Sequence, residues 1–167
     1  RDDALKLARL YQLGELPESR LPSLADRQHR ALFQHRQTMV GRRVALQNGI
    51  RALFLAQGEA MPTGASAWTE AGFAQMQSYV KPLAECGVEE LWRGQLHLML
   101  EELMSLLKLL KVTEKRLDAI ASSDPRTVIL QTMPGVGPRT AEVVANYLGE
   151  AKRFKKSGEV SAYAGLV

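Results

Sequence analysis

The chain lacks the features of an exported or membrane-bound protein. It has no run of eighteen apolar residues and no basic segment followed by an apolar stretch at its start. Its single cysteine, Cys86, cannot form an internal disulfide, which is typical of a reducing compartment. It also begins at Arg1 and not at a methionine. We therefore expect a soluble, unexported, cytoplasmic fragment that contacts no membrane.

Histidine and cysteine side chains that could ligate a metal are also scarce. His29 and His35 are six residues apart on one expected helix and face different ways, while His97 lies far along the chain. These histidines cannot form a metal site with Cys86. Metal binding through histidine or cysteine is therefore not expected.

No segment alternates like a β-strand, and no internal repeat or low-complexity tract is present. Apolar residues make up 46% of the 167 residues, which is enough to bury one core or two small ones. We therefore predict an all-α fold.

Capping signals bound the first expected helices. Residues 3–13 have apolar positions at helical spacing and are followed by Gly14, which can adopt the left-handed conformation that ends a helix. A longer helix should start after Ser23, because Ser23 and Asp26 form the S-x-x-D pattern of a capping box. Gly58 is the predicted end of this helix.

Two further helices are expected before the hairpin ends. Thr69 can cap a helix that runs towards Glu85 and that Pro82 ends or bends. The stretch from Gly87 to Ser122 has no proline and predicts the strongest helix of the chain.

Both long helices carry a seam with alternating steps of three and four residues. The first seam is predicted at Leu32, His35, Met39, Arg42, Leu46, Gly49 and Leu53. The second is predicted at Leu96, Met99, Leu103, Leu106, Leu110, Thr113, Leu117 and Ile120. Opposed seams predict an antiparallel hairpin.

Leu100 and Leu107 widen the apolar face of the second long helix. The wider face can contact a second copy of the chain, which would give a homodimer through the coiled coil. It can equally cover the shorter helices of the same chain. The pattern leaves both interpretations open.

Positive charge is concentrated in two segments. The net charge of +4 and the pI near 9.4 fit many proteins that never bind nucleic acid. Between residues 24 and 56, however, six arginines accompany one acid, Asp26, whereas residues 86–120 are slightly acidic. The arginine-rich helix can contact nucleic acid or be an ordinary solvated face. Its candidate contacts are Arg36, Arg42, Arg43 and Arg51. The second basic segment consists of Lys152, Arg153, Lys155 and Lys156.

Residues 128–149 read VILQTMPGVGPRTAEVVANYLG: an apolar helix, a P-G-V-G-P turn and a second helix. Asp124 and Pro125 supply a cap and a proline suited to the first helical position. The inner face of the second helix is predicted at Ala141, Val144, Ala145 and Leu148. The pattern resembles the helix-hairpin-helix of DNA repair and recombination proteins. Together with the two seams, it predicts a long antiparallel coiled-coil hairpin followed by a helix-hairpin-helix region.

This turn has a physical reason to bind phosphate. Gly135 and Gly137 let the backbone approach closely, and the N–H groups that open the second helix point at the anion with the helix dipole behind them. Such contacts hold a duplex without reading its sequence. The predicted DNA contacts are Gly135, Val136, Gly137, Arg139 and Thr140, extended by Lys152, Arg153, Lys155 and Lys156. The alternative is a glycine-rich elbow between two packed helices.

Four segments together carry a family resemblance. They are D-A-L-K-L-A at 3–8, R-x-x-x-V-G-R-R-x-x-x-x-N-x-I-R-x-L at 36–53, L-Q-T-M-P-G-V-G-P-R-T-A at 130–141 and A-Y-A-G-L at 162–166. In this order they resemble the insertion-sequence 110 family of transposases, which are DEDD-type recombinases related to the Piv and MooV invertases.

The resemblance implies a RuvC-like domain whose four acids bind Mg²⁺, a coiled-coil insert and a transposase domain whose serine attacks DNA. Residues 1–14 would then be the last helix of the RuvC-like domain, 15–122 the coiled-coil region and 123–167 the helix-hairpin-helix start of the transposase domain. Asp3 matches the final acid of the D-x-x-D-A pattern, while the other acids and the serine would lie outside this chain. We therefore expect Mg²⁺ in the parent protein but no complete metal site here.

The expected function is that of a DNA-binding and assembly fragment, itself inactive in strand cleavage, of a transposase or site-specific recombinase that mobilises an insertion sequence. The resemblance also implies a bacterial, nucleoid-associated location and, in some members, a guide RNA. Two alternatives are a non-enzymatic helical scaffold and a DNA-repair helix-hairpin-helix protein. The repair protein would share the turn motif but not the four ordered segments.

Overall fold

The computed structural model describes residues 2–15 and 21–165. Within these residues the regular secondary structure is helical throughout and contains no strand, which confirms the all-α prediction. Leu166, the last position of the A-Y-A-G-L segment, lies outside the described residues. In the described part of the chain, no helix combines the length and the apolar character needed to cross a bilayer.

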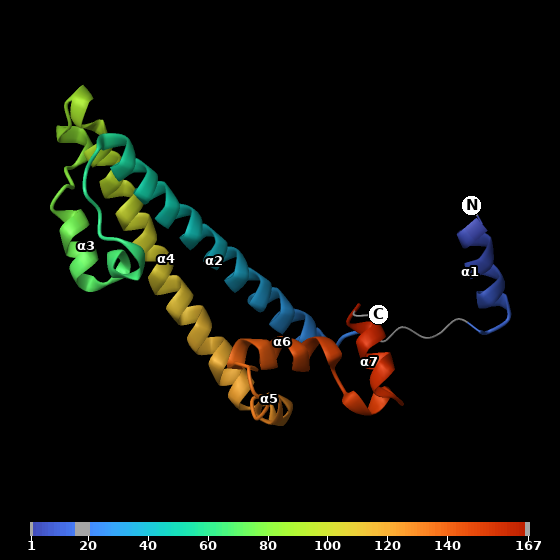
Figure 1. Cartoon of the computed structure of the whole chain (residues 1–167). Helices are drawn as coiled ribbons and strands as arrows, with labels where there is room; N and C mark the ends of the chain where they lie inside the picture. Colours follow the sequence, from blue (N-terminus) through green and yellow to red (C-terminus); the bar gives the residue numbers. More distant parts are fainter. Residues whose placement is uncertain (1, 16–20, 166–167) are drawn as a thin grey trace.

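Two long helices, α2 (Leu24–Gln57) and α4 (Leu91–Ser122), lie side by side and run in opposite directions (Figure 1). At the start of α2, the hydroxyl of Ser23 accepts a hydrogen bond from the Asp26 N–H at 3.0 Å, and the Asp26 carboxylate accepts one from the Ser23 N–H at 3.2 Å. The helix ends at Gly58, whose φ is +68°. Both predicted boundaries are therefore confirmed. The supercoiling expected of a coiled coil stays a prediction.

The chain between the long helices folds against one end of the hairpin, which we call the tip (Figure 1). It contains three short 3₁₀ turns and one α-helix: η1 (Gly64–Trp68), α3 (Glu70–Gln77), η2 (Leu83–Glu85) and η3 (Val88–Glu90). The buried hydrophobic cluster of the tip consists of Ile50, Phe54, Met76, Leu96, Leu100 and Leu103.

Two helix boundaries at the tip were predicted wrongly. α3 starts at the Thr69 cap as expected but ends at Gln77 and not near Glu85, because the chain turns there and places the Tyr79 ring 5.3 Å from that of Phe54. α4 begins at Leu91, after a 3₁₀ turn, and not directly after Gly87.

The seam of α2 was predicted only in part. Met39 is buried as expected, but His35 and Arg42 are exposed, and Ile50 and Phe54 are the fully buried positions. A straight helix has 3.6 residues per turn, so a three-four repeat drifts around its surface over several turns. The seam of α4 is confirmed at its central positions, with Leu103, Leu106, Leu110 and Leu117 all buried.

The widened leucine face of α4 is covered by the same chain. Leu100 is 1% exposed in the tip core, and Leu107 packs against that core. The interpretation that these leucines cover shorter helices of the same chain therefore accounts for them. The homodimer stays a prediction.

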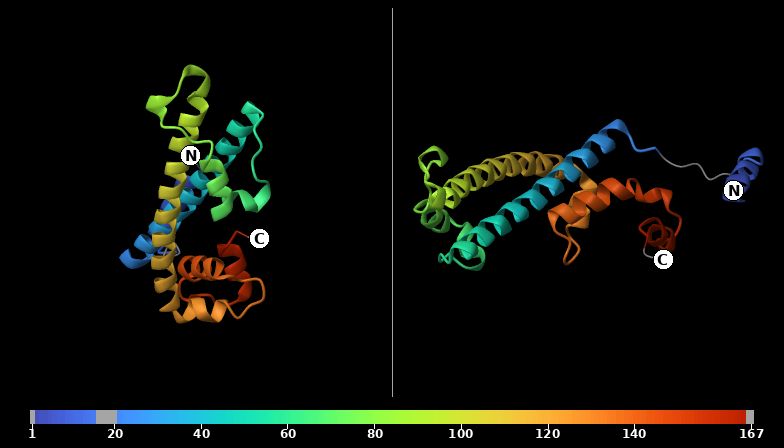
Figure 2. Two further views of the ribbon diagram at one scale, coloured as in Figure 1. Left: turned by 90° about the vertical axis from the view of Figure 1, so that its left-hand side faces the viewer. Right: turned by 90° about the horizontal axis from the view of Figure 1, so that it is seen from above.

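At the other end of the hairpin, which we call the base, α6 (Pro138–Leu148) lies across the hairpin and contacts both long helices (Figures 1 and 2). α5 (Pro125–Leu130) packs against α4 and α6, and its cap at Asp124 is confirmed by a 2.9 Å hydrogen bond from the Arg126 N–H. A 3₁₀ turn, η4 (Ala151–Arg153), leads to α7 (Ser157–Tyr163).

The first helix, α1 (Asp2–Gln12), lies apart from the rest of the molecule (Figure 2). Gly14, at φ +67°, follows its end, as predicted. Leu5, Tyr11 and Leu13 are all more than half exposed, at 62%, 77% and 68%. The division of the chain into three domains stays a prediction.

Candidate nucleic-acid interface

The turn between α5 and α6 has the backbone that the glycine motif predicts. Gly135 has a φ of +82°, a conformation that side chains with a Cβ rarely adopt. Gly137 is the N-cap residue of α6, with an extended backbone at φ −77° and ψ 170°. Its carbonyl accepts the first helical hydrogen bond, from the Ala141 N–H at 3.0 Å. Only Gly135 therefore needs glycine for its conformation.

The opening of α6 leaves donors available. Pro138 has no N–H, and the N–H groups of Arg139 and Thr140 have no acceptor among the described residues. A Cβ placed on Gly135 or Gly137 would meet no atom of a non-neighbouring residue within 4 Å. An anion could therefore reach these N–H groups along the helix axis.

The Arg139 side chain is used inside the protein. One guanidinium nitrogen donates to Glu142 at 2.5 Å, and the other donates to the Asp118 carboxylate and to the Glu114 carbonyl at 3.2 Å. These bonds join the first turn of α6 to α4. Arg139, predicted as a DNA contact, therefore has its donors directed at its own chain.

A buried carboxylate joins α6 to α2. Glu142 is 1% exposed, and its second oxygen lies 2.6 Å from Nε2 of His29 on α2. Asn146, one turn further along α6, lies 3.0 Å from Nδ1 of the same histidine. Arg30 donates to the Asn146 side chain at 2.7 Å. This polar network fixes α6 against α2 and α4.

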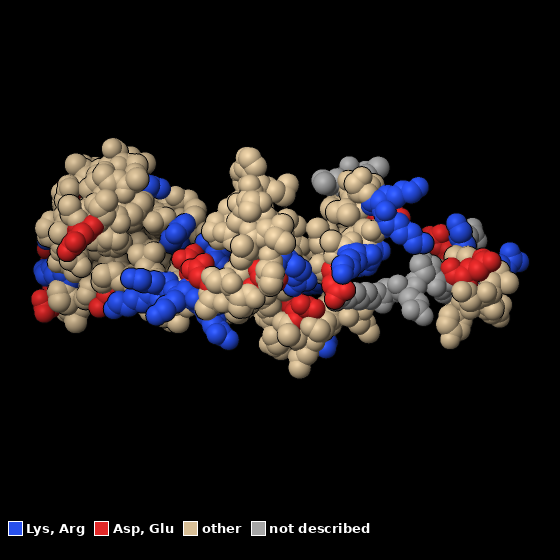
Figure 3. Space-filling model, turned by 90° about the horizontal axis from the view of Figure 1, so that it is seen from below, with Lys and Arg blue, Asp and Glu red and all other residues tan. Residues whose placement is uncertain are grey.

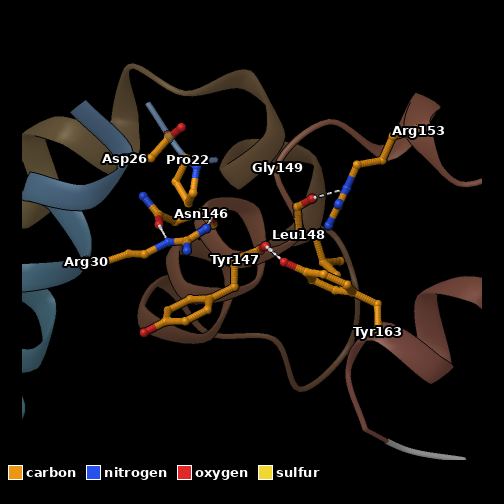
Figure 4. Close-up of a pocket in the computed structure, with 9 residues that line it drawn as sticks. All are labelled: Pro22, Asp26, Arg30, Asn146, Tyr147, Leu148, Gly149, Arg153 and Tyr163. Atoms are coloured by element: carbon orange, nitrogen blue, oxygen red, sulfur yellow. Dashed lines mark hydrogen bonds between the residues drawn. The ribbon is translucent and has the colours of Figure 1, made fainter. Parts of the chain in front are cut away.

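The other end of α6 is capped by side chains from α2, η4 and α7 (Figure 4). The last carbonyls of the helix accept from Arg30 (Asn146 O, 2.8 Å), Tyr163 (Tyr147 O, 3.3 Å) and Arg153 (Leu148 O, 3.0 Å). Guanidinium groups favour this position because the C-terminal end of a helix carries partial negative charge. The Arg153 guanidinium also lies 4.2 Å from the Tyr163 ring centre. This contact ties α7 to the base.

The buried face of α6 differs from the predicted one. Ala141 and Ala145 are buried as expected, but Glu142 and Asn146 are buried with them, while Val144 and Leu148 are only half-buried. The reason is that α6 faces polar partners on α2 and α4. Sequence analysis therefore missed Glu142 and Asn146. The only local signal was a carboxylate and an amide spaced four residues apart beside two alanines.

The second basic segment does not adjoin the turn. Lys152, Lys155 and Lys156 are exposed around η4 and the start of α7, beyond the C-terminal end of α6. With 11 residues at about 1.5 Å each, α6 separates them from Gly137 by roughly 16 Å. Thr140 and Val136 lie at the turn itself, exposed and half-buried respectively.

The four candidate arginines of α2 have different surroundings. Arg36 is bonded to Glu114 at 2.6 Å, and Arg51 donates to the Gly64 carbonyl at 3.3 Å. Arg43 lies within the hairpin, and its Nε is buried without a partner among the described residues. Arg42 is exposed. The helix is therefore only in part the free basic face that its composition suggests.

Asp3 lies exposed on α1. Within residues 2–15 and 21–165, no group of three or more histidine, cysteine, aspartate or glutamate side chains could hold a metal ion. One carboxylate does not make a magnesium site. The described residues therefore do not fit the ion by themselves.

Comparison with known proteins identifies relatives of the chain. Residues 128–167 match the Transposase IS116/IS110/IS902 family. The whole chain is 26% identical to the "Transposase for insertion sequence element IS1111A" of Coxiella burnetii and covers 44% of that protein. A stretch of 56 residues, 34% of the chain, is 34% identical to the "Insertion element IS110 uncharacterized 43.6 kDa protein" of Streptomyces coelicolor and covers 14% of it. No solved structure matches.

These matches confirm the relationship predicted from the four segments: the chain is a relative of the insertion-sequence 110 transposases. It spans less than half the length of either curated relative. The family match covers the α5–α6 turn and α7.

Proposed function

We propose that this chain binds duplex DNA as part of a transposase, with the α5–α6 turn as the contact that holds the DNA backbone. The observation that carries the proposal is the first turn of α6, where the N–H groups of Arg139 and Thr140 lack acceptors within the described residues and the space beside Gly137 is open. The family match, which includes this turn, supports it. The contact would be independent of sequence, because phosphates are the same in every duplex.

The polar network of the base supports the proposal by fixing the orientation of α6. Its partners come from α2 and α4, and the Glu142 carboxylate at their centre is almost fully buried. The N–H groups are therefore aimed before DNA arrives, so little conformational freedom is lost on binding. In this proposal Arg139 and Arg153 hold α6, while Lys152, Lys155 and Lys156 supply a second backbone contact at its far end.

For the whole protein, we propose cleavage and exchange of insertion-sequence ends in the bacterial nucleoid. Mg²⁺ would be bound by Asp3 together with acids outside this chain. A guide RNA and a homodimer are further proposals from the family resemblance. The 167-residue chain alone should not cleave DNA, because one carboxylate cannot hold the two ions of such a site.

A substitution at Gly137 tests the proposal. Aspartate there would cap α6 and keep the helix folded, but its carboxylate would occupy the phosphate position and repel the backbone. We expect Gly137→Asp to weaken binding about equally on two unrelated duplexes, measured by fluorescence anisotropy at moderate salt, with an unchanged circular dichroism spectrum.

Gly87→Asp is the matched control. Gly87 is also an exposed N-cap glycine with a similar backbone, at φ −70° and ψ 168°, but it lies at the tip of the hairpin. The substitution Gly87→Asp adds the same charge as Gly137→Asp without changing the α5–α6 turn. If Gly137→Asp binds duplex DNA as tightly as Gly87→Asp does, the turn is a structural elbow and the proposal is wrong.

A further inference from the structure

α4 carries a row of exposed lysines. Lys108, Lys111 and Lys115 are spaced by three and four residues, so they share one face of the helix over about 10 Å. None of them forms an ion pair within the part of the chain that the structure describes. From below, Lys and Arg side chains gather over the hairpin as well as beside α7 (Figure 3).

The acids on this half of α4 do not balance the row. Glu114 is bonded to Arg36 at 2.6 Å, and Asp118 is bonded to Arg139. Each acid is thus paired with an arginine from another helix. The positive charge of the three lysines is therefore left facing solvent.

The row leads to the α5–α6 turn. Asp118 follows Lys111 by seven residues, two helical turns, and so lies on nearly the same face of α4. Asp118 is the residue that Arg139 in the first turn of α6 reaches. The lysine face of α4 and the opening of α6 are therefore on the same side of the hairpin. The basic segment that sequence analysis assigned to the turn lies instead at the opposite end of α6.

We propose that Lys108, Lys111 and Lys115 bind the phosphate backbone of the same DNA duplex that the α5–α6 turn holds, so that the duplex lies along this face of α4. This inference rests on the proposed function. Lysine ammonium groups bind phosphates as point charges on flexible stems, so the row contacts DNA of any sequence. It gives the hairpin, and not only the turn, a role in holding the duplex.

The salt dependence of binding tests the inference. Removing one lysine–phosphate contact lowers the slope of log affinity against log salt by about 0.9 for duplex DNA. Lys108→Gln, Lys111→Gln and Lys115→Gln combined in the full chain should therefore lower the slope by about 2 to 3. A single Lys115→Gln should lower it by about 0.9.

Arg116→Gln is the matched control. Arg116 is the next residue on the same helix and is also exposed, but it points about 100° away from Lys115. We expect its replacement to leave the slope unchanged. Equal changes for Lys115→Gln and Arg116→Gln would overturn the inference, because they would show a general effect of net charge.

Three further outcomes are decisive. An unchanged slope in the triple variant, while Gly137→Asp weakens binding, overturns this inference and leaves the proposed function standing. Failure of the unmodified chain to bind duplex DNA overturns both. A triple variant that loses affinity for an RNA hairpin but keeps its affinity for duplex DNA assigns the lysines to RNA and overturns the inference.

Cross-linking locates the bound duplex directly. In a Cys86→Ser background the chain has no other cysteine, so a photoreactive group can be attached at one chosen position. Lys111→Cys and Lys115→Cys should then cross-link to a bound duplex, and Arg116→Cys should not. Cross-linking of Arg116→Cys alone would place the duplex on another face of α4 and overturn the inference.

Discussion

The two ends of the hairpin are stabilised by different kinds of contact. At the tip, Phe54 packs against the rings of Tyr79 and Trp92 at 5.3 and 6.2 Å, within a core of buried aliphatic side chains. At the base, the contacts between α2, α4 and α6 centre on the buried Glu142 and its bonds to His29 and Arg139. Apolar packing is strong but weakly directional, whereas hydrogen bonds fix orientation.

The difference indicates which end serves stability and which end, in the proposed function, serves binding. A helix that must present its N–H groups in one direction gains from directional contacts, even though buried charges add little net stability. The tip needs only to join the two long helices. We therefore expect tip variants to change mainly stability, and base variants to change DNA binding more than their stability loss explains.

The largest effect on stability should come from breaking the tip. Phe54 is 1% exposed, and Phe54→Ala should lower the free energy of unfolding by about 3 to 5 kcal/mol, because it removes a buried ring and leaves a cavity. Urea denaturation followed by circular dichroism measures this. The folded fraction should still bind duplex DNA with unchanged affinity; a parallel loss of affinity would mean that the tip also positions the α5–α6 turn.

Breaking the base should cost less stability and more binding. Glu142→Ala leaves His29 and Arg139 without their carboxylate and should lower the free energy of unfolding by about 2 to 3 kcal/mol. Because α6 loses its fixed orientation, affinity for duplex DNA should fall as well. Glu142→Gln, which keeps the shape and part of the hydrogen bonding, should lie between Glu142→Ala and the unmodified chain. Affinity unchanged in both variants would refute the role of the network in positioning α6.

A smaller effect is expected at the cap of α5. The Arg126 guanidinium bonded to Asp124 holds the pKa of this carboxyl below its usual range. Asp124→Ala should cost about 1 kcal/mol of stability at neutral pH through loss of the cap. Because the pKa of the Asp124 carboxyl is lower in the folded chain than in the unfolded chain, its charge stabilises the fold at a pH above its unfolded pKa. The stabilisation by this charge should fade as the pH falls below about 4. Asp124→Asn, which caps well without charge, is the control; an equal loss in Asp124→Asn would assign the effect to charge and not to capping.

The smallest change in stability, and of opposite sign, is expected at Gly137. A serine there can accept from the free N–H groups of α6, so Gly137→Ser should raise stability by a few tenths of a kcal/mol. Its hydroxyl occupies the donors that we assign to phosphate, so affinity for DNA should fall. Thermal unfolding measures the stability of Gly137→Ser, and fluorescence anisotropy on the same sample measures its affinity for DNA. A more stable protein with undiminished affinity would contradict the proposed role of the turn.

Local signals predicted local structure well. Each of the caps at Ser23, Asp124 and Gly58 joins residues only a few positions apart in the sequence, and all three caps are confirmed. The end of α3 was missed because the packing of Tyr79 on Phe54, which no local pattern shows, accompanies the turn of the chain there. The start of α4 was missed because a 3₁₀ turn, Val88–Glu90, precedes it.

The base could not be predicted because its partners are distant in sequence. Arg139 has the type and position of a phosphate ligand, but its donors are taken by Asp118 on α4 and by Glu142. The lysine row of α4 was hidden for another reason. Residues 86–120 are slightly acidic on average. Only the structure shows that an acid beside the lysines, Glu114, is already paired with Arg36 from another helix.

The base network also sets an order of folding. His29 and Glu142 are separated by 113 residues, and Arg30 and Asn146 by 116. Contacts of such long separation form late, because the entropy of closing the loop must be overcome first, and a chain emerging from the ribosome completes its N-terminal contacts earlier. The hairpin tip can therefore assemble while α6 is still being synthesised. Only when Arg153 and Tyr163 have emerged can the capped end of α6 be completed, so the orientation of this helix is fixed late in synthesis.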